Sequence, residues 1–192
     1  MIEALRAEIS NCRVCEAHLP LGPRPVVQIG AAARLLIIGQ APGTRVHATG
    51  IPWEDASGER LREWLGIDAE TFYDPSQVAM MPMGFCYPGA VKGGGDLPPR
   101  PECAPLWHAR IRASLTDIRL TLLIGQFAQH RYLAASRRVT LTETVRRAAD
   151  MLPDFMPLPH PSWRSTTWMR NNLWFETDIL PLLREAVRSA LA

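Results

Sequence analysis

The chain has 192 residues, of which 47% are hydrophobic, and a formal net charge of +2 at pH 7. This length and composition predict a single domain, residues 1–192, with a sizeable core. The net charge alone does not imply a polyanionic partner, although it does not exclude a local basic face on the surface. The sequence has no apolar run near eighteen residues and no signal-peptide pattern in its first six residues, so we expect a cytoplasmic protein that does not span a membrane.

The first half of the chain is predicted to contain a helix, a loop, a strand and a second helix. Residues 2–11 have apolar side chains at helical spacing, and the proline-rich segment 18–25 is expected to be an extended loop. The apolar run 35–38 ends at a glycine and is typical of a buried parallel strand. Ser57 is a residue type that caps helices, and apolar residues at i, i+3 and i+4 spacing follow it, so we expect a helix there.

The second half continues the alternation of strands and helices. Apolar runs predict strands at 78–83, 120–124 and 155–158, and helical spacing predicts helices from about residue 105, over 127–133 and from about 175 to 191. Residues 88–101 are rich in glycine and proline and are expected to form a loop. Strands that alternate with helices indicate an α/β fold, so we predict a three-layer α/β/α architecture around a central four-stranded parallel sheet.

The four cysteines fall into two pairs. Cys12 and Cys15 form a C-x-x-C motif, and sixteen residues separate Cys86 from Cys103. Because cytosolic thiols are kept reduced, this layout favours four thiolates on one metal centre over two disulfides. Four thiolates suit both zinc and an iron–sulfur cluster, and the sequence does not separate the two. Four unconnected buried cysteines are the alternative.

Three segments follow strands and are expected to meet at one edge of the sheet, where ligands bind in parallel α/β folds. They are residues 39–43, the loop after Met83, and residues 160–162. The first, Gly-Gln-Ala-Pro-Gly, can form a tight turn that brings backbone amides close to a ligand, or an ordinary strand-to-helix turn. Trp53, a few residues on, offers an aromatic plane for a base to stack on, or is a core residue.

His160 begins a segment rich in residue types that contact phosphate. A histidine at a strand end can donate a hydrogen bond to negative charge that develops on a substrate oxygen. Ser162, Arg164 and Arg170 follow it, together with threonine and asparagine side chains, and are candidates for contacts with a phosphate backbone. A solvated loop is the alternative.

Together these motifs resemble the uracil-DNA glycosylase superfamily, most closely its iron–sulfur-containing family 4 branch. The family pattern has a C-x-x-C motif, a GE(A/G)PG loop, a G-R-P-F segment, a second cysteine pair and an H-P loop after the last strand. In this chain the pattern falls, in the same order, on Cys12/Cys15, Gly39–Gly43, Gly50–Trp53, Cys86/Cys103 and His160–Arg164. The resemblance covers most of the chain.

The resemblance implies a monomeric DNA glycosylase that removes a deaminated base, uracil first, from DNA in base excision repair. It implies that the four cysteines hold a structural [4Fe-4S] cluster. His160 would stabilise the departing base and Gln40 would hold the attacking water. The base would be bound by Ala41, Trp53 and Gly84, and the DNA backbone by Ser162, Arg164 and Arg170.

The chain departs from the family pattern at positions that bear on activity. Many members carry a carboxylate at the position of Gln40 or Ala41; Asp55 or Glu54 is a candidate replacement, and a solvated acidic pair is the alternative. Pro82 stands where family 4 has an asparagine that reads the uracil edge. These departures leave two other hypotheses open: a protein that binds lesions or single-stranded DNA without turnover, and an enzyme that acts on a small nucleoside.

Overall fold

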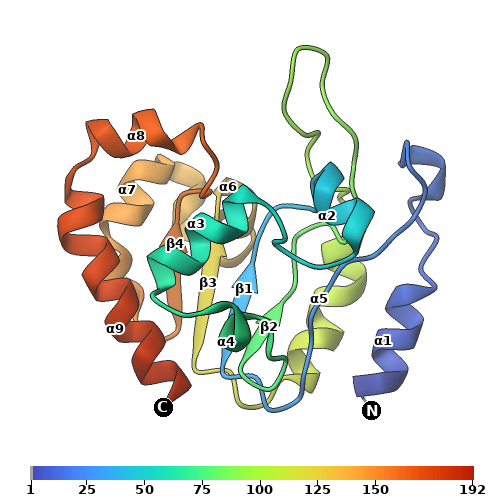
Figure 1. The fold of residues 1–192 in the computed structure, drawn as a ribbon, viewed down its shortest axis with the longest axis horizontal. Coiled ribbons are helices and arrows are strands. Elements are labelled where there is room, and N and C mark those ends of the chain that lie inside the picture. The colour runs from blue at the N-terminus through green and yellow to red at the C-terminus, as the bar shows by residue number, and fades with distance from the viewer. Residues whose placement is uncertain (1) are drawn as a thin grey trace.

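The computed structural model describes residues 2–192, and in that part of the chain four parallel strands form one sheet. The strands are β1 (Leu35–Ile38), β2 (Val78–Met80), β3 (Leu120–Ile124) and β4 (Phe155–Leu158), in the order β2-β1-β3-β4 (Figure 1). The chain passes from β1 to β2 on one side and then to β3 on the other. The strand order therefore reverses beside β1, and ligands of open parallel sheets bind at such a point.

Both faces of the sheet are buried. In β1, Leu35 and Ile37 belong to one apolar cluster, and Leu36 and Ile38 belong to a second cluster on the opposite face. Because successive side chains of a strand point to opposite faces, an unbroken apolar strand needs a covering layer on each side.

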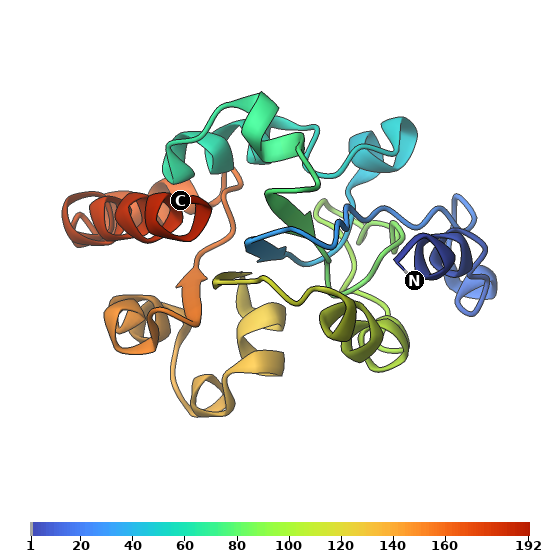
Figure 2. The same ribbon diagram turned by 90° about the horizontal axis from the view of Figure 1, so that it is seen from below.

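Helices provide both layers, as Figure 2 shows, which confirms the predicted three-layer α/β/α fold. One face is covered by α3 (Ala56–Leu65), α4 (Ala69–Tyr73) and α9 (Leu180–Leu191), and α9 continues the π-helical turn η4 (Phe175–Ile179). The other is covered by α5 (Cys103–Ser114) and α6 (Gln126–Tyr132), with α1 (Ile2–Ser10) beside α5. The remaining elements are α2 (Thr44–Thr49), α7 (Leu141–Arg146), α8 (Ser165–Asn171) and the 3-10 turns η1 (Glu16–His18), η2 (Ala134–Arg138) and η3 (Ala148–Met151).

Three local predictions were wrong. Ser57 does not cap α3: Asp55 does, because its Oδ1 accepts the N–H of Gly58 at 2.9 Å. The strand expected over 78–83 ends at Met80, because Pro82 has no N–H to donate to a neighbouring strand. Residues 165–171 form α8, where the sequence predicted a loop. Across residues 2–192, no helix is both long and apolar enough to cross a lipid bilayer.

Candidate functional site

A pocket of about 520 Å³ lies at the carboxyl ends of β1, β2 and β4, and we call it the strand-end pocket. Its walls come mainly from five stretches: residues 39–43, 52–57, 80–82, 95–96 and 160–164. Its volume is in the range of small-molecule binding sites. The pocket brings together most of the site residues predicted from the sequence: Gln40, Ala41, Trp53, Asp55, His160, Ser162 and Arg164. Arg170 instead lines a separate groove among α3, α8 and α9.

Trp53 has an unusual backbone conformation in this pocket, with a φ angle of 58°. A bulky residue keeps such a conformation only where its surroundings hold it. The Tyr73 hydroxyl donates a hydrogen bond of 3.3 Å to the Trp53 carbonyl, and a Cβ at Gly58 would lie 1.7 Å from that oxygen. The indole lies against Gly39, where a Cβ would be 2.7 Å from Cζ2. Two glycines and a tyrosine therefore fix the aromatic wall of the pocket.

His160 lies at the end of β4 beside Trp53, with the ring centroids 5.7 Å apart. Burial lowers the pKa of His160 below its ordinary value, and the negative charge of Asp55 opposes this shift. The imidazole is therefore neutral at neutral pH and can donate one N–H. The Ser165 hydroxyl donates to the backbone carbonyl of His160 and holds the segment in place.

The first loop, residues 39–43, is supported by the segment that follows β2. The N–H groups of Met83 and Gly84 donate to the carbonyls of Gly39 and Gln40, both at 2.9 Å. Gly84 thus supports the first loop and does not line the pocket, whereas the sequence analysis expected it to contact the base. The Gln40 side chain forms no hydrogen bond with the described protein atoms and can hold a water in the pocket.

Pro82 lines the pocket, and a histidine that the sequence analysis did not single out holds its carbonyl. His108 Nε2 lies 3.0 Å from the Pro82 oxygen, and His108 Nδ1 lies 2.7 Å from the Tyr132 hydroxyl. Because a carbonyl only accepts, Nε2 carries the proton and Nδ1 accepts from Tyr132. Burial lowers the pKa of His108 to about 4. The only signal for this role in the sequence was a polar residue within the apolar pattern of α5.

Two carboxylates line the strand-end pocket. One is Asp55, which caps α3 as described above. The other is Asp96, in the glycine-rich loop, whose backbone forms an antiparallel bridge with Ala90. Asp96 is exposed to solvent, but partial desolvation raises its pKa; the positive charge of Arg164 opposes the shift, and the charge of Asp55 adds to it. Sequence reasoning missed Asp96, because three preceding glycines do not indicate where a loop will fold.

The loop after His160 is anchored at two points. Arg60 Nη1 donates to the Ser162 carbonyl at 2.8 Å, and a Cβ at Gly95 would lie 2.8 Å from Arg164 Nη1. Between these anchors, the Trp163 side chain is 75% exposed, and its ring centroid lies 5.3 Å from Arg164 Cζ. A solvated aromatic ring beside a guanidinium suits contacts with the bases and phosphates of a nucleic acid. The sequence analysis did not name Trp163 as a site residue.

All four cysteines line a second, largely apolar pocket, which we call the cysteine pocket. Their thiols are free, and the cavity that they line is small, about 10 Å³. The Phe85 N–H donates to Cys103 Sγ at 3.4 Å. Burial raises the pKa of Cys86 to about 11 and that of Cys103 to about 12. Such thiols become thiolates only where a positively charged group compensates for burial.

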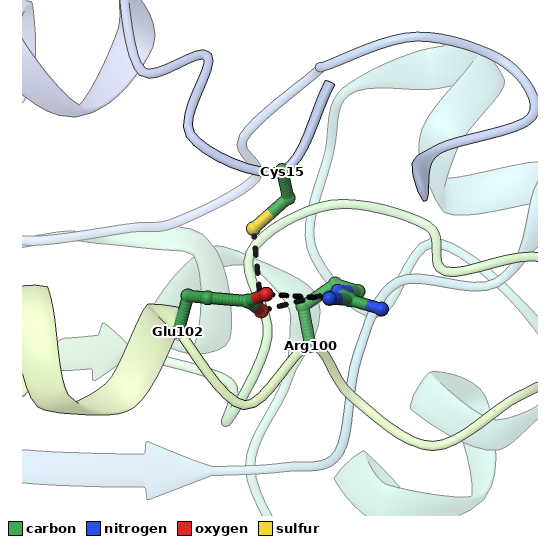
Figure 3. A network of polar contacts seen from close by, with 3 residues as sticks. All are labelled: Cys15, Arg100 and Glu102. Carbon is green, nitrogen blue, oxygen red and sulfur yellow. Dashed lines mark hydrogen bonds and ion pairs between the residues drawn. The ribbon is translucent and has the colours of Figure 1, made fainter. Parts of the chain in front are cut away.

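Polar groups at the edge of the cysteine pocket form a short network (Figure 3). Glu102 pairs with Arg100, and Cys15 Sγ donates to Glu102 Oε2 at 3.7 Å. The hydrogen bond from Arg100 lowers the pKa of Glu102 to about 2. Trp107 also lines the pocket, and its buried Nε1 has no partner among residues 2–192. Four thiols and an unused N–H suit a thiolate-bound group with sulfur acceptors of its own.

The cysteines do not form a site for a single ion in this geometry. Within residues 2–192, no group of three or more His, Cys, Asp or Glu side chains is arranged to hold one metal ion. All four thiols nevertheless line one pocket, and four thiolates are a ligand set of both iron–sulfur clusters and zinc. The predicted cofactor stays a prediction.

The chain was compared with models of known protein families. The model of the uracil DNA glycosylase superfamily matches residues 27–184. This range contains all four strands, every lining residue of the strand-end pocket except Val26, and the second cysteine pair, whereas Cys12 and Cys15 precede it. The match covers well over half of the chain, and the fold and pocket position agree with it. The chain therefore belongs to the uracil DNA glycosylase superfamily, whose members are hydrolytic DNA glycosylases.

Proposed function

We propose that this protein excises a deaminated base, uracil first, from DNA by hydrolysis of the N-glycosidic bond, as a step of base excision repair. We also assign it to the iron–sulfur-containing family 4 branch. The observation that carries the proposal is the strand-end pocket, where a strained aromatic residue and a half-buried neutral histidine, Trp53 and His160, stand side by side. Backbone strain of this kind concentrates at functional sites.

The pocket supports a mechanism in which the target base leaves the DNA stack and enters beside Trp53. As the bond between base and sugar lengthens, negative charge develops on the base, and the N–H of His160 stabilises it. A neutral imidazole does this as a hydrogen-bond donor, without full proton transfer. Water held near Gln40 attacks the sugar carbon, which leaves an abasic site and the free base.

The rim of the pocket supports DNA as the partner. Ser162 and Arg164 lie at its edge, and Trp163 is exposed between them. Arginine and serine side chains are common phosphate contacts, and an exposed indole can take the space that the flipped base leaves in the stack. Arg170 lies in a separate groove, so its contact with DNA is the less supported part of the predicted set.

The cysteine pocket supports the proposed [4Fe-4S] cluster, with zinc as the alternative. Cys12, Cys15, Cys86 and Cys103 would hold it, and the unpaired N–H of Trp107, which lines the same pocket, would be available to one of its sulfurs. Its bonds to four thiolates would tie the segment after α1 to the glycine-rich loop and to the start of α5. The cluster would supply structure, and no catalytic step is assigned to it.

The residues that line the pocket also support a second function, the binding of a lesion without release of a base. Pro82 lines the pocket where family 4 has its base-reading asparagine, and the first loop presents Gln40 and Ala41 without a carboxylate. A protein with this pocket could bind a lesion without releasing a base. It would retard lesion-containing oligonucleotides and form no abasic sites.

The test is an excision assay on protein purified without oxygen. Single-stranded and double-stranded oligonucleotides with one uracil or one hypoxanthine are incubated with the protein, and alkali-labile abasic sites are counted on a gel. Alkali-labile cleavage at the lesion, with the free base in equal amount, supports the glycosylase. Retardation of the same oligonucleotides without cleavage supports the binding protein.

A further inference from the structure

Hydrolysis of the glycosidic bond needs a group that orients the attacking water and accepts its proton, and this inference rests on the proposed function. The first loop contains no such group, because Gln40 and Ala41 occupy the positions where many family members have a carboxylate. Only two carboxylates of the described chain line the strand-end pocket, Asp55 and Asp96. The question is which of the two is free to act.

Asp55 already has a structural task. Its Oδ1 accepts the N–H of Gly58 at 2.9 Å at the beginning of α3. This hydrogen bond occupies one carboxylate oxygen and fixes the Asp55 side chain at the beginning of α3. The sequence analysis named Asp55 as a candidate for the replacement carboxylate, but its geometry is that of a helix cap.

Asp96 stands at the base of a hairpin of residues 89–97, which we call the glycine hairpin and which rises above the sheet in Figure 1. The Leu97 N–H donates to the Gly89 carbonyl at 2.8 Å and closes the hairpin. The hairpin returns over the first loop, so that a Cβ at Gly43 would lie 3.7 Å from Asp96 Oδ2. The Asp96 carboxylate forms no hydrogen bond or ion pair with residues 2–192.

Arg164 holds the glycine hairpin on its other side. Gly95 has a φ of 100°, and a Cβ there would lie 2.8 Å from Arg164 Nη1, so the guanidinium rests against bare backbone. Arg164 belongs to the same loop as His160. That loop therefore places the histidine that faces the leaving base and also fixes the hairpin that carries Asp96. The Asp96 residue is exposed to solvent, and partial desolvation still raises the pKa of its carboxylate, which strengthens it as a proton acceptor.

We infer that Asp96 is the catalytic carboxylate that holds the attacking water in the strand-end pocket and accepts its proton. The water oxygen bonds to C1′ of the deoxyribose while the bond from C1′ to the base nitrogen breaks. The electron pair of that bond leaves with the base, and the His160 N–H stabilises the resulting negative charge. The proton on Asp96 then passes to the departed base through solvent, which restores the carboxylate.

The test is the single-turnover rate of uracil excision from a single-stranded oligonucleotide, measured with the metal-loaded protein. Asp96→Asn is expected to lower this rate about 100-fold or more, because a general base contributes about 10²–10⁴. The Kd for the same oligonucleotide and the Tm are expected to stay close to those of the wild type. Asp117→Asn, at an exposed position between α5 and β3, is the matched control and keeps the wild-type rate.

A second variant tests the carboxylate itself. Asp96→Ala leaves space where the side chain was, and added sodium formate is expected to restore part of the lost rate, because formate supplies a carboxylate. A residue that only braced the hairpin would lose affinity or Tm and would not respond to formate.

The outcomes separate the inference from the proposed function. An active wild type together with an Asp96→Asn rate within about threefold of it overturns the role of Asp96 alone. Loss of affinity or Tm without a loss of rate, or no response to formate, also overturns it. A wild type that excises neither uracil nor hypoxanthine overturns the proposed function, and this inference with it.

Discussion

The imidazole of His160 lies 5.7 Å from the indole of Trp53, and the two ring planes are inclined by 30°. Trp53 is fixed by a left-handed backbone and two neighbouring glycines, so it limits the directions in which His160 can point. A hydrogen-bond donor that is oriented before the reaction needs no reorganisation when charge develops on the substrate. The conformation of the loop that contains Trp53 therefore affects the chemistry that we assign to His160.

His160→Ala is expected to cost about 2–4 kcal/mol of transition-state stabilisation, or roughly 30- to 1,000-fold in rate, the range found for single oxyanion donors. Single-turnover excision of uracil measures the effect. His130→Ala, in α6 and outside the pocket, is the matched control. An excision rate that does not respond to the loss of His160 would remove it from the mechanism.

Gly39→Ala is expected to displace the indole, because the new Cβ would lie 2.7 Å from Trp53 Cζ2. We expect a loss of about 1–3 kcal/mol in the free energy of unfolding, as for overpacked cores, together with a lower excision rate. Trp53→Phe in the same chain removes the clashing atoms, so the double variant should recover part of the stability. Denaturant unfolding of the wild type, the two single variants and the double variant gives the coupling energy between residues 39 and 53. Strictly additive effects would show that the two residues do not constrain each other.

The neutral, buried His108 predicts a loss of stability in acid. Its pKa falls from the ordinary 6.5 to about 4 on folding, so below pH 6.5 the unfolded chain binds a proton that the folded protein excludes. The stability present above pH 6.5 is therefore lost as the pH falls toward 4, by roughly 2 kcal/mol between pH 7 and pH 5. Urea unfolding at these two pH values measures it. In His108→Gln, which cannot titrate, this contribution should vanish; an equal pH dependence in both proteins would assign it to other groups.

The cysteine pocket predicts metal-dependent stability. Protein purified without oxygen should contain iron and inorganic sulfide in equal amounts, and Cys103→Ala should lose both. The loss of a structural metal should cost several kcal/mol, which lowers the Tm by roughly 10 °C in a chain of this size. Trp107→Phe keeps all four thiols, so it should keep the iron but release it faster to a chelator. Zinc in place of iron would favour the alternative cofactor, and an equally stable protein without metal would contradict the structural role.

The rim of the pocket predicts electrostatic binding of DNA. Arg164→Ala should reduce the slope of log K against log salt concentration by about one, the value for one phosphate contact. Arg188→Ala, on α9 and paired with Glu185, is the matched control and should leave the slope unchanged. Fluorescence anisotropy with an abasic oligonucleotide at several salt concentrations measures both. Equal slopes for Arg164→Ala and the wild type would show that the guanidinium serves the glycine hairpin alone.

Local pattern was enough to predict the layers of the fold. The apolar runs of β1, β3 and β4 fall where they were expected, since buried parallel strands need unbroken apolar segments. The ends of helices were less predictable. Asp55 and Ser57 are both residue types that cap helices, and the sequence alone does not decide between them; in the structure Asp55 accepts the Gly58 N–H. Motifs at strand ends also placed most of the pocket correctly, because parallel strands bring their carboxyl ends together.

Residues that reach the site through long-range folding escaped prediction. The three glycines before Asp96 do not indicate the direction of the hairpin, which is closed by its own backbone hydrogen bonds and lies against Arg164. In the sequence, His108 is only a polar residue within a predicted helix, yet in the structure its side chain contacts the Pro82 carbonyl, 26 residues away. The left-handed backbone of Trp53 is likewise a product of its neighbours. Such features depend on tertiary contacts that the local pattern does not encode.

The central claim is that the strand-end pocket releases a base by hydrolysis, and one measurement tests it most directly. A uracil-containing oligonucleotide is incubated with the anaerobically purified wild type and with His160→Ala, and free uracil and abasic sites are quantified together by mass spectrometry. The account predicts equal amounts of both products with the wild type and a loss of roughly 30- to 1,000-fold in rate for the variant. Tight binding of the oligonucleotide by the wild type, with no free uracil and no abasic site, would contradict it.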